Sequence, residues 1–396
     1  MRNITSVIAE KVYTPSHEIA DAVVLIEDGR ITRVGPRSKV KVPRGAEVVD
    51  HGKLTLVPGF IDVHIHGAFG NDFMDGTSQS LISGARFLAR KGTTSFLAST
   101  VTAGVDNTFK AIRALAEAAR IQHLAAENGD DQPPGAELLG IHFEGPFLCA
   151  KRLGAQPAEH VQPPSVDLLR KFLDVADGHG VAITLAPEVE GAMPILKYAR
   201  RRGLKVAIGH SDATVEEAER ALAAGATHAT HTFNAMRPFS HRDPGIIGAV
   251  LADDRVLAEL ICDGVHVHPG AVRVLAKSKG LDHILLISDG GPGTGMPDGN
   301  YRIHNFDVTI ADGVCRNLEG HLAGSTTTLD AELRNLAKFT GRSYAEVLPC
   351  ATLNPARLLG LEKRKGVIAP GADADLVALD AKYRVVQTYV RGRPVL

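Results

Sequence analysis

Short apolar segments alternate with amphipathic stretches through the middle of the chain. The apolar segments cover residues 59–63, 94–97, 138–143, 181–185, 206–208, 228–231, 257–261 and 284–287. Helical spacing of apolar residues marks the stretches between them, among them 79–91, 107–126, 165–177, 215–224 and 271–277. This alternation predicts an α/β fold, a closed (β/α)8 TIM barrel over residues 58–357. A doubly wound sheet is the alternative, and it is disfavoured because no G-x-G-x-x-G follows the first apolar segment.

Both ends of the chain follow a different sequence pattern, with short β-rich runs and turns. A hairpin is predicted for residues 22–26 and 31–34, with its turn at Asp28-Gly29. Near the carboxyl end, the same pattern of short strands and turns covers residues 374–379, 385–386 and 388–390. Neither end is large enough to bury a core alone. We therefore predict that residues 1–57 and 358–396 pack together as one small β-sandwich domain.

Composition limits the classes of partner. The 396 residues include 44 Lys and Arg against 45 Asp and Glu, a formal charge of -1. Without a strong overall field, we expect neither a nucleic-acid partner nor a membrane partner, and any charged ligand must be recognised locally. The four cysteines, Cys149, Cys262, Cys315 and Cys350, lie far apart, and no secretory signal or membrane-length apolar run is present. These features predict a cytoplasmic protein.

Candidate catalytic and metal-binding residues lie where the predicted strands end. A (β/α)8 barrel places its active site at the carboxyl-terminal ends of its strands. The residues at these positions are His64, His66, Glu144, His210, His231 and Asp289. Each one alone also fits an ordinary role, such as a surface histidine pair or a structural ion pair. Together they offer the nitrogen and carboxylate ligands of a zinc-type hydrolytic site with an open water position.

Longer segments around these residues resemble the amidohydrolase superfamily and, within it, the N-acetylglucosamine-6-phosphate deacetylase family. The similar segments are 57–67 with Asp72 and Asp75 after it, 142–147, 209–212, 231–236, 243–245, 263–266, 288–290, 322–324 and 354–356. The Glu-Gly-Pro run at 144–146 and the Asn-Ala-Met run at 234–236 are the specific features. The H-x-H motif is shared by the whole superfamily.

The resemblance implies a divalent metal centre with one or two ions per chain, zinc foremost, with iron, cobalt or manganese as alternatives. Glu144, His210 and His231 would bind the principal ion. His64 and His66 fit a second position, where Glu144 replaces the carboxylated lysine of many relatives.

The resemblance also implies a set of substrate contacts: Ala155, Gln156, Asn234, Ala235, Arg242, His266, Leu322, Ala323 and Gly324. Asn234 and Ala235 would hold the sugar phosphate region, and the loop at 322–324 would face the substrate largely through its backbone. Arg242 would reach the phosphate, often in the neighbouring subunit's site of a homodimer. Gln156 stands near the place of a histidine that assists the substrate carbonyl in some members; it can donate a hydrogen bond but cannot be cationic.

The implied reaction is metal-dependent hydrolysis of the acetyl amide of N-acetylglucosamine 6-phosphate, with Asp289 as general base and then general acid. Three alternatives stay open at this point. The substrate could be the galactosamine isomer or another N-acyl or cyclic amide, although no lysine closes the segment at 181–187 to serve as a carboxylated bridge. The chain could also be a catalytically silent scaffold of the same fold, which would be expected to lack metal ligands, and none of the six site residues is missing.

Overall fold

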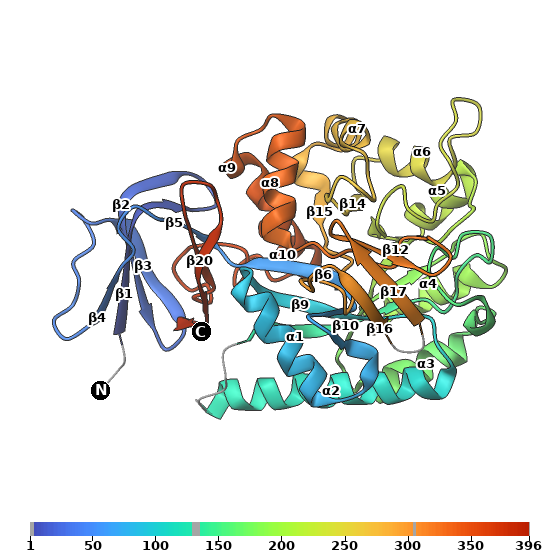
Figure 1. The fold of residues 1–396 in the computed structure, drawn as a ribbon, viewed down its shortest axis with the longest axis horizontal. Helices are drawn as coiled ribbons and strands as arrows, with labels where there is room; N and C mark the ends of the chain where they lie inside the picture. Colours follow the sequence, from blue (N-terminus) through green and yellow to red (C-terminus); the bar gives the residue numbers. More distant parts are fainter. Residues whose placement is uncertain (1–3, 129–134, 304–305, 396) are drawn as a thin grey trace.

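A parallel barrel forms the larger part of the molecule (Figure 1). The computed structural model describes residues 4–128, 135–303 and 306–395. The barrel strands, in neighbouring order, are β6 (Phe60–Ile65), β9 (Thr93–Thr100), β10 (Glu137–Glu144), β11 (Gly180–Leu185), β12 (Lys205–Ile208), β13 (His228–Ala229), β14 (Leu257–Leu260) and β15 (Ile284–Leu286). The barrel closes where Ile65 bridges to Gly290 beyond β15. Each of these strands overlaps a predicted apolar segment, so the predicted barrel is confirmed.

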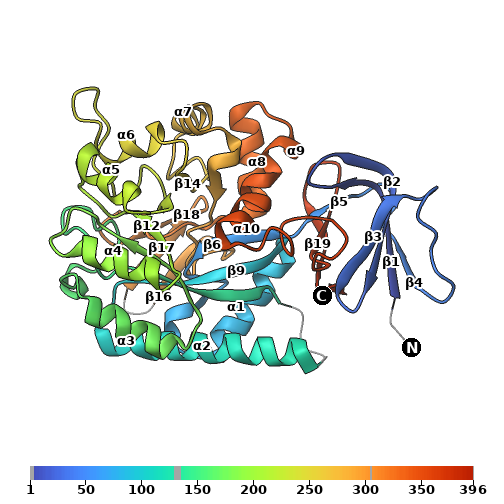
Figure 2. The same cartoon turned by 180° about the vertical axis from the view of Figure 1, so that it is seen from behind.

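Helices surround the barrel (Figures 1 and 2). They are α1 (Ser78–Arg90), α2 (Val105–Asn128), α3 (Val166–Ala176), α4 (Ala192–Arg201), α5 (Val215–Ala223), α6 (Gly245–Ala252), α7 (Pro269–Lys279) and α8 (Leu329–Thr340), followed by α9 (Tyr344–Val347) and α10 (Leu353–Leu359). Short 3-10 turns lie at Phe73–Asp75, Ala158–His160, Leu281–His283 and Leu348–Ala351. The side chains of Thr77, Ser165 and Thr214 cap α1, α3 and α5 by accepting a backbone N–H. None of the described helices combines the length and apolar character needed to cross a bilayer.

Strands from both chain ends form a second eight-stranded sheet, the terminal sheet, beside the barrel (Figure 2). It contains β1 (Ile4–Tyr13), β2 (Glu18–Glu27), β3 (Arg30–Pro36), β4 (Glu47–Asp50) and β5 (Thr55–Pro58), with β19 (Leu376–Leu379), β20 (Val385–Val390) and β21 (Arg393–Pro394). The two ends meet where β5 pairs antiparallel with β19. In the β2–β3 hairpin, Gly29 adopts a φ of 75°, which favours glycine. The predicted union of the two ends is confirmed, whereas the division at residues 57/58 and 357/358 stays a prediction.

Two further small sheets were not expected from the sequence. One is the antiparallel sheet of β16 (Gly299–Ile303), β17 (Phe306–Ala311) and β18 (Val314–Asn317), and the other pairs β7 (Gly67–Ala68) with β8 (Asn71–Asp72). The backbone N–H of Ala323 donates to Cys315, and that of Ser325 donates to Asp289. The three-stranded sheet therefore holds the loop at 322–324 beside the barrel mouth.

Candidate metal centre

Six side chains predicted from the sequence meet at the carboxyl ends of the barrel strands. His64 lies on β6 and His66 directly after it, Glu144 ends β10, and His210, His231 and Asp289 follow β12, β13 and β15. Alternation along β6 lets both of its histidines face the same side. Parallel strands bring their ends to one edge, so residues up to 225 positions apart in the chain become neighbours.

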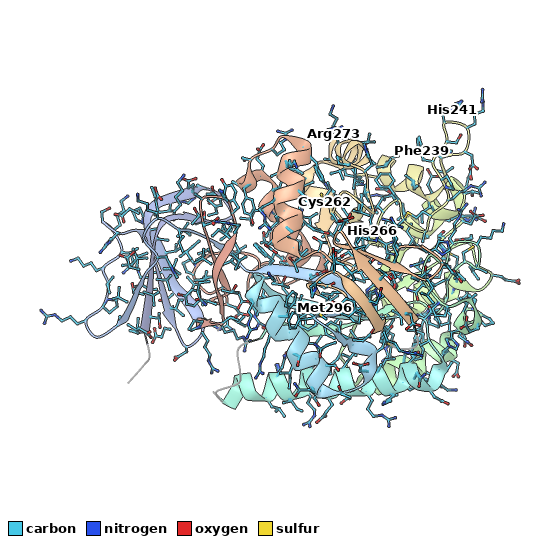
Figure 3. The ribbon with its side chains drawn as sticks, in the orientation of Figure 1. Phe239, His241, Cys262, His266, Arg273 and Met296 are labelled. Carbon is cyan, nitrogen blue, oxygen red and sulfur yellow. The ribbon has the colours of Figure 1, made fainter. Side chains whose placement is uncertain are left out.

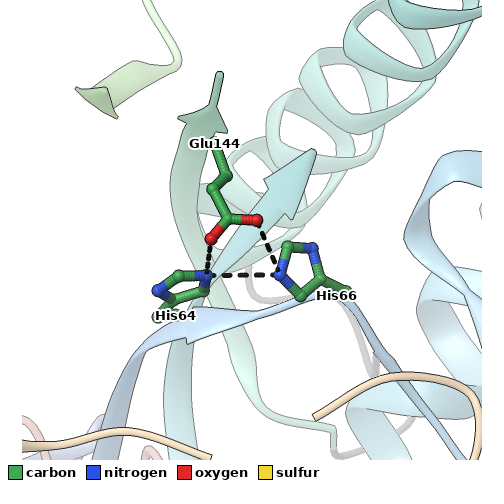
Figure 4. A group of neighbouring side chains, drawn as sticks. All are labelled: His64, His66 and Glu144. Carbon is green, nitrogen blue, oxygen red and sulfur yellow. Dashed lines mark hydrogen bonds and ion pairs between the residues drawn. The ribbon is translucent and has the colours of Figure 1, made fainter. Parts of the chain in front are cut away.

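Glu144 is the centre of this cluster. Its Oε1 atom lies 3.2 Å from the Nε2 atoms of His64, His210 and His231, and its Oε2 atom lies 3.4 Å from Nε2 of His66. His64 and His66 approach each other at 3.2 Å between Nε2 atoms (Figure 4), and His210 and His231 do so at 3.0 Å. Two groups of three potential ligands therefore share one carboxylate, and each group has a geometry that could hold a metal ion.

The charges of the cluster fit a bound cation. Glu144, Glu259 and Asp289 form no ion pair with lysine or arginine within the described residues, although all three are largely buried. Burial raises the pKa of Glu144, but His64, His210 and His231 outweigh this effect and hold it well below its ordinary value. Burial lowers the pKa of His64, whereas Glu144, Glu259 and Asp289 raise it well above the ordinary value. Buried carboxylates facing imidazoles need positive charge nearby, which a divalent ion could supply.

Several backbone positions at the mouth are strained. His210, His231, Ala235 and Asp289 adopt φ values of 47°, 28°, 49° and 45°, in the left-handed region that non-glycine residues seldom visit. Such conformations cost about 1–3 kcal/mol each and persist where the surrounding structure fixes them. The backbone N–H of Asp289, for example, donates to the carbonyl of His64 over 3.0 Å.

Buried polar residues behind the cluster were missed by the sequence reasoning. Glu259 on β14 lies 3.0 Å from Nδ1 of His64, and Asp62 on β6 accepts from the hydroxyl of Ser288 over 2.6 Å. Burial raises the pKa of Asp62 to about 7. His142 on β10 lies between Ser99 and Thr184, 2.9 Å from each hydroxyl. The sequence signal that could have found them is a charged residue inside an apolar strand. Such a residue requires a partner wherever it lies along the strand, and not only at the end of the strand.

Some predicted substrate residues do lie beside the cluster. Gln156 donates from Nε2 to Glu144 and accepts the backbone N–H of Thr102 at 2.8 Å. Asn234 contacts the carbonyl of His231 at 3.2 Å, and the carbonyl of Ala235 accepts from Ser211. A side chain at Gly324 would lie 3.4 Å from the carbonyl of Asp289, so Leu322, Ala323 and Gly324 belong to a loop at the mouth.

Other predicted residues are not brought to the cluster within this chain. Arg242 is exposed on the loop 237–243, which projects away from the barrel and carries Phe239 and His241 (Figure 3). Ala155 is also exposed. His266 follows β14 at the same end of the barrel, where its Nδ1 atom lies 2.6 Å from Asp263.

A third group of potential metal ligands, consisting only of carboxylates, lies elsewhere, between the barrel and the terminal sheet. Glu137, Asp373 and Asp375 could together hold an ion by geometry alone. The ammonium group of Lys365 already lies among them, 2.7 Å from Glu137 and Asp375 and 3.2 Å from Asp373. This group is therefore an internal ion-pair network.

Comparison with known proteins shows the class of protein to which the chain belongs. The profile of the amidohydrolase family matches residues 55–395, and the chain belongs to this family. Within the family, it is similar to the N-acetylglucosamine-6-phosphate deacetylase of Bacillus subtilis, with 37% identity over 96% of this chain and 94% of the relative. The N-acetylgalactosamine-6-phosphate deacetylase of Escherichia coli O157:H7 is 35% identical over 97% of each chain.

Solved structures agree with these sequence matches. An N-acetyl-D-glucosamine-6-phosphate deacetylase mutant from Mycobacterium smegmatis, in complex with N-acetyl-D-glucosamine-6-phosphate, aligns over 100% of both chains with 32% identity and a TM-score of 0.90. The corresponding enzyme from Thermotoga maritima aligns over 99% of both chains with 34% identity and a TM-score of 0.84. The resemblance predicted from the sequence is confirmed.

Proposed function

We propose that this chain hydrolyses the acetyl amide of N-acetylglucosamine 6-phosphate, giving glucosamine 6-phosphate and acetate. The observation that carries the proposal is the cluster of four histidines around Glu144, in a chain similar over nearly its whole length to N-acetylglucosamine-6-phosphate deacetylases. Hydrolysis of a linear amide needs an activated water and a proton for the leaving nitrogen. The barrel mouth offers groups for both tasks.

Glu144, His210 and His231 would hold the principal divalent ion, and His64 and His66, with Glu144, would hold a second. A divalent ion bound there would lower the pKa of water toward about 7 and polarise a carbonyl oxygen. Zinc suits the imidazole and carboxylate donors, and iron, cobalt or manganese are the alternatives. Glu144 is 2% exposed, which suits a group that stays bound rather than one that meets substrate.

Asp289 would accept the proton of the attacking water and return it to the departing amine. Its side chain is 16% exposed, more than that of Glu144, and its Oδ1 atom lies 3.3 Å from Nε2 of His66. Burial raises the pKa of Asp289, but His64, His66 and His231 lower it below the ordinary value. The group therefore starts as a carboxylate, as a general base must.

The remaining predicted contacts would hold the phosphorylated sugar. Asn234, Ala235, His266 and the loop at 322–324 surround the mouth, and Gln156 contributes through its link to Glu144. Arg242 would bind the phosphate because its planar guanidinium pairs with phosphate oxygens. Its exposed place on a projecting loop suits a homodimer in which it serves the partner's site. The four free cysteines accord with the proposed cytoplasmic location.

Deacetylation of N-acetylgalactosamine 6-phosphate is the second candidate, because one relative of nearly equal identity carries that name. A direct test measures acetate release from both phosphorylated isomers and from unphosphorylated N-acetylglucosamine. The proposal expects the highest kcat/KM for N-acetylglucosamine 6-phosphate. A higher value for the galactosamine isomer would transfer the assignment to that substrate, and no release from either isomer would refute deacetylation.

A further inference from the structure

Glu259 is a charged residue in the middle of an apolar barrel strand, β14. Only 1% of it is exposed, and no lysine or arginine pairs with it in the described part of the chain. A buried carboxylate without such a partner is costly unless hydrogen bonds compensate it. Its contacts therefore indicate why it lies there.

One oxygen of Glu259 contacts both groups of metal-site residues. Its Oε2 atom lies 3.0 Å from Nδ1 of His64 and accepts the backbone N–H of His231 at 3.1 Å. His64 belongs to the group with His66, and His231 belongs to the group with His210. The carbonyl of Glu259 also accepts the N–H of Thr232 at 2.8 Å, which anchors the chain beside His231 a second time.

The contact with His64 fixes the tautomer of its ring. The Oε2 atom of Glu259 lies 3.0 Å from Nδ1 of His64, and the oxygens of a carboxylate only accept hydrogen bonds. A neutral His64 ring that donates from Nδ1 keeps its lone pair on Nε2, where it could bind a metal ion. Figure 4 shows that Nε2 is the atom that faces His66 and Glu144.

The contact with His231 acts on the backbone. At a φ of 28°, this residue has an unfavourable conformation that its surroundings must maintain. Hydrogen bonds to the side chain and carbonyl of Glu259 hold the N–H groups of residues 231 and 232 in place. The imidazole of His231 is thereby directed toward Glu144, with its Nε2 atom 3.2 Å from Oε1.

We propose that Glu259 is a positioning residue that aligns both groups of metal ligands, setting the ring of His64 for one ion and the backbone of His231 for the other. This inference rests on the proposed metal-dependent function. A carboxylate that orients a histidine through its second ring nitrogen typically changes metal affinity by about 10–100-fold when removed.

The test is zinc binding by the full-length protein, measured by competition with a chromophoric chelator in the absence of sugar. Glu259→Gln keeps the size of the side chain but lets an amide N–H face His64 or His231. We expect the zinc dissociation constant to rise by roughly 10–100-fold, while the melting temperature of the metal-free protein stays near the wild-type value. Glu259→Asp keeps the charge and should recover part of the affinity.

Glu332→Gln is the matched control. Glu332 on α8 is 0% exposed, and among the described residues it forms no hydrogen bond with a histidine, so its replacement should leave zinc affinity unchanged. Unaltered zinc affinity in Glu259→Gln would overturn the inference. If that variant does not fold, Glu259→Asp decides, and wild-type affinity there overturns it too. Wild-type protein that binds zinc but releases no acetate would instead refute the proposed function alone.

Discussion

At the scale of single residues, the barrel mouth separates groups that would hold an ion from the group that would move a proton. Glu144 is enclosed by four histidines, whereas Asp289 contacts His64 and His66 from the more exposed side. Similar carboxylates can serve different roles when their surroundings differ. Substitution can separate the two roles.

Asp289→Asn should lower kcat by roughly 10²–10⁴-fold, because an amide cannot accept the proton of water. Zinc content should stay at the wild-type level, since Asp289 is outside both groups of three potential ligands. Acetate release and elemental analysis of the same sample check both statements. Asp174→Asn on the exposed surface of α3 is the control. Near-normal turnover by Asp289→Asn would remove Asp289 from the mechanism.

The sequence predicted the residues of the cluster because each one closes an apolar segment. It did not reveal Glu259 and Asp62, which lie inside strands and contact His64 and Ser288. The same argument from buried charge applies to them, but their partners are distant in the chain, and only the closed barrel brings the groups together. The place of Arg242 relative to a neighbouring subunit is also beyond a single sequence.

At the scale of elements, periodicity predicted the strands of the barrel and many of its helices. Helix α6 was not predicted because its sequence, GIIGAVLA, has no polar face, and residues 245–250 are all buried. The sheet of β16–β18 was not predicted for another reason. It is inserted after the last barrel strand, so it does not continue the alternation of strands and helices from which the barrel was predicted.

The projecting loop 237–243 contains Arg242, the proposed phosphate-binding residue. Arg242→Ala should raise the KM for N-acetylglucosamine 6-phosphate by roughly 10–100-fold, because a hydrogen bond to a charged group contributes about 1.5–3 kcal/mol. The unphosphorylated sugar should be affected little. Arg255→Ala provides a control, since Arg255 is exposed and pairs with Asp253. An unchanged preference for the phosphorylated sugar would exclude Arg242 from phosphate binding.

At the scale of the whole molecule, buried charged residues join the barrel to the terminal sheet. Lys365 is 2% exposed and contacts Glu137 on β10 together with Asp373 and Asp375 just before β19. The neighbouring guanidinium of Arg364 also pairs with Asp373 at 2.8 Å. The network therefore connects β10 of the barrel to the segment just before β19, which the sequence could not indicate because Glu137 and Lys365 lie more than 200 residues apart.

Lys365→Met should destabilise the protein by about 3–5 kcal/mol, because removal of one partner leaves buried carboxylates uncompensated. The midpoint of denaturant unfolding measures this loss. Lys382→Met, at an exposed position, should change stability by less than about 0.5 kcal/mol. Equal stability of the two variants would show that the network does not hold the two parts together.

Metal-dependent deacetylation can be tested by following acetate release from N-acetylglucosamine 6-phosphate as metal is removed and restored. Protein stripped by a chelator should release no acetate, and activity should return in proportion to bound zinc, up to one or two equivalents per chain. Acetate release that survives complete metal removal would exclude a metal-dependent reaction. Inactivity at full zinc occupancy would contradict the proposed deacetylation.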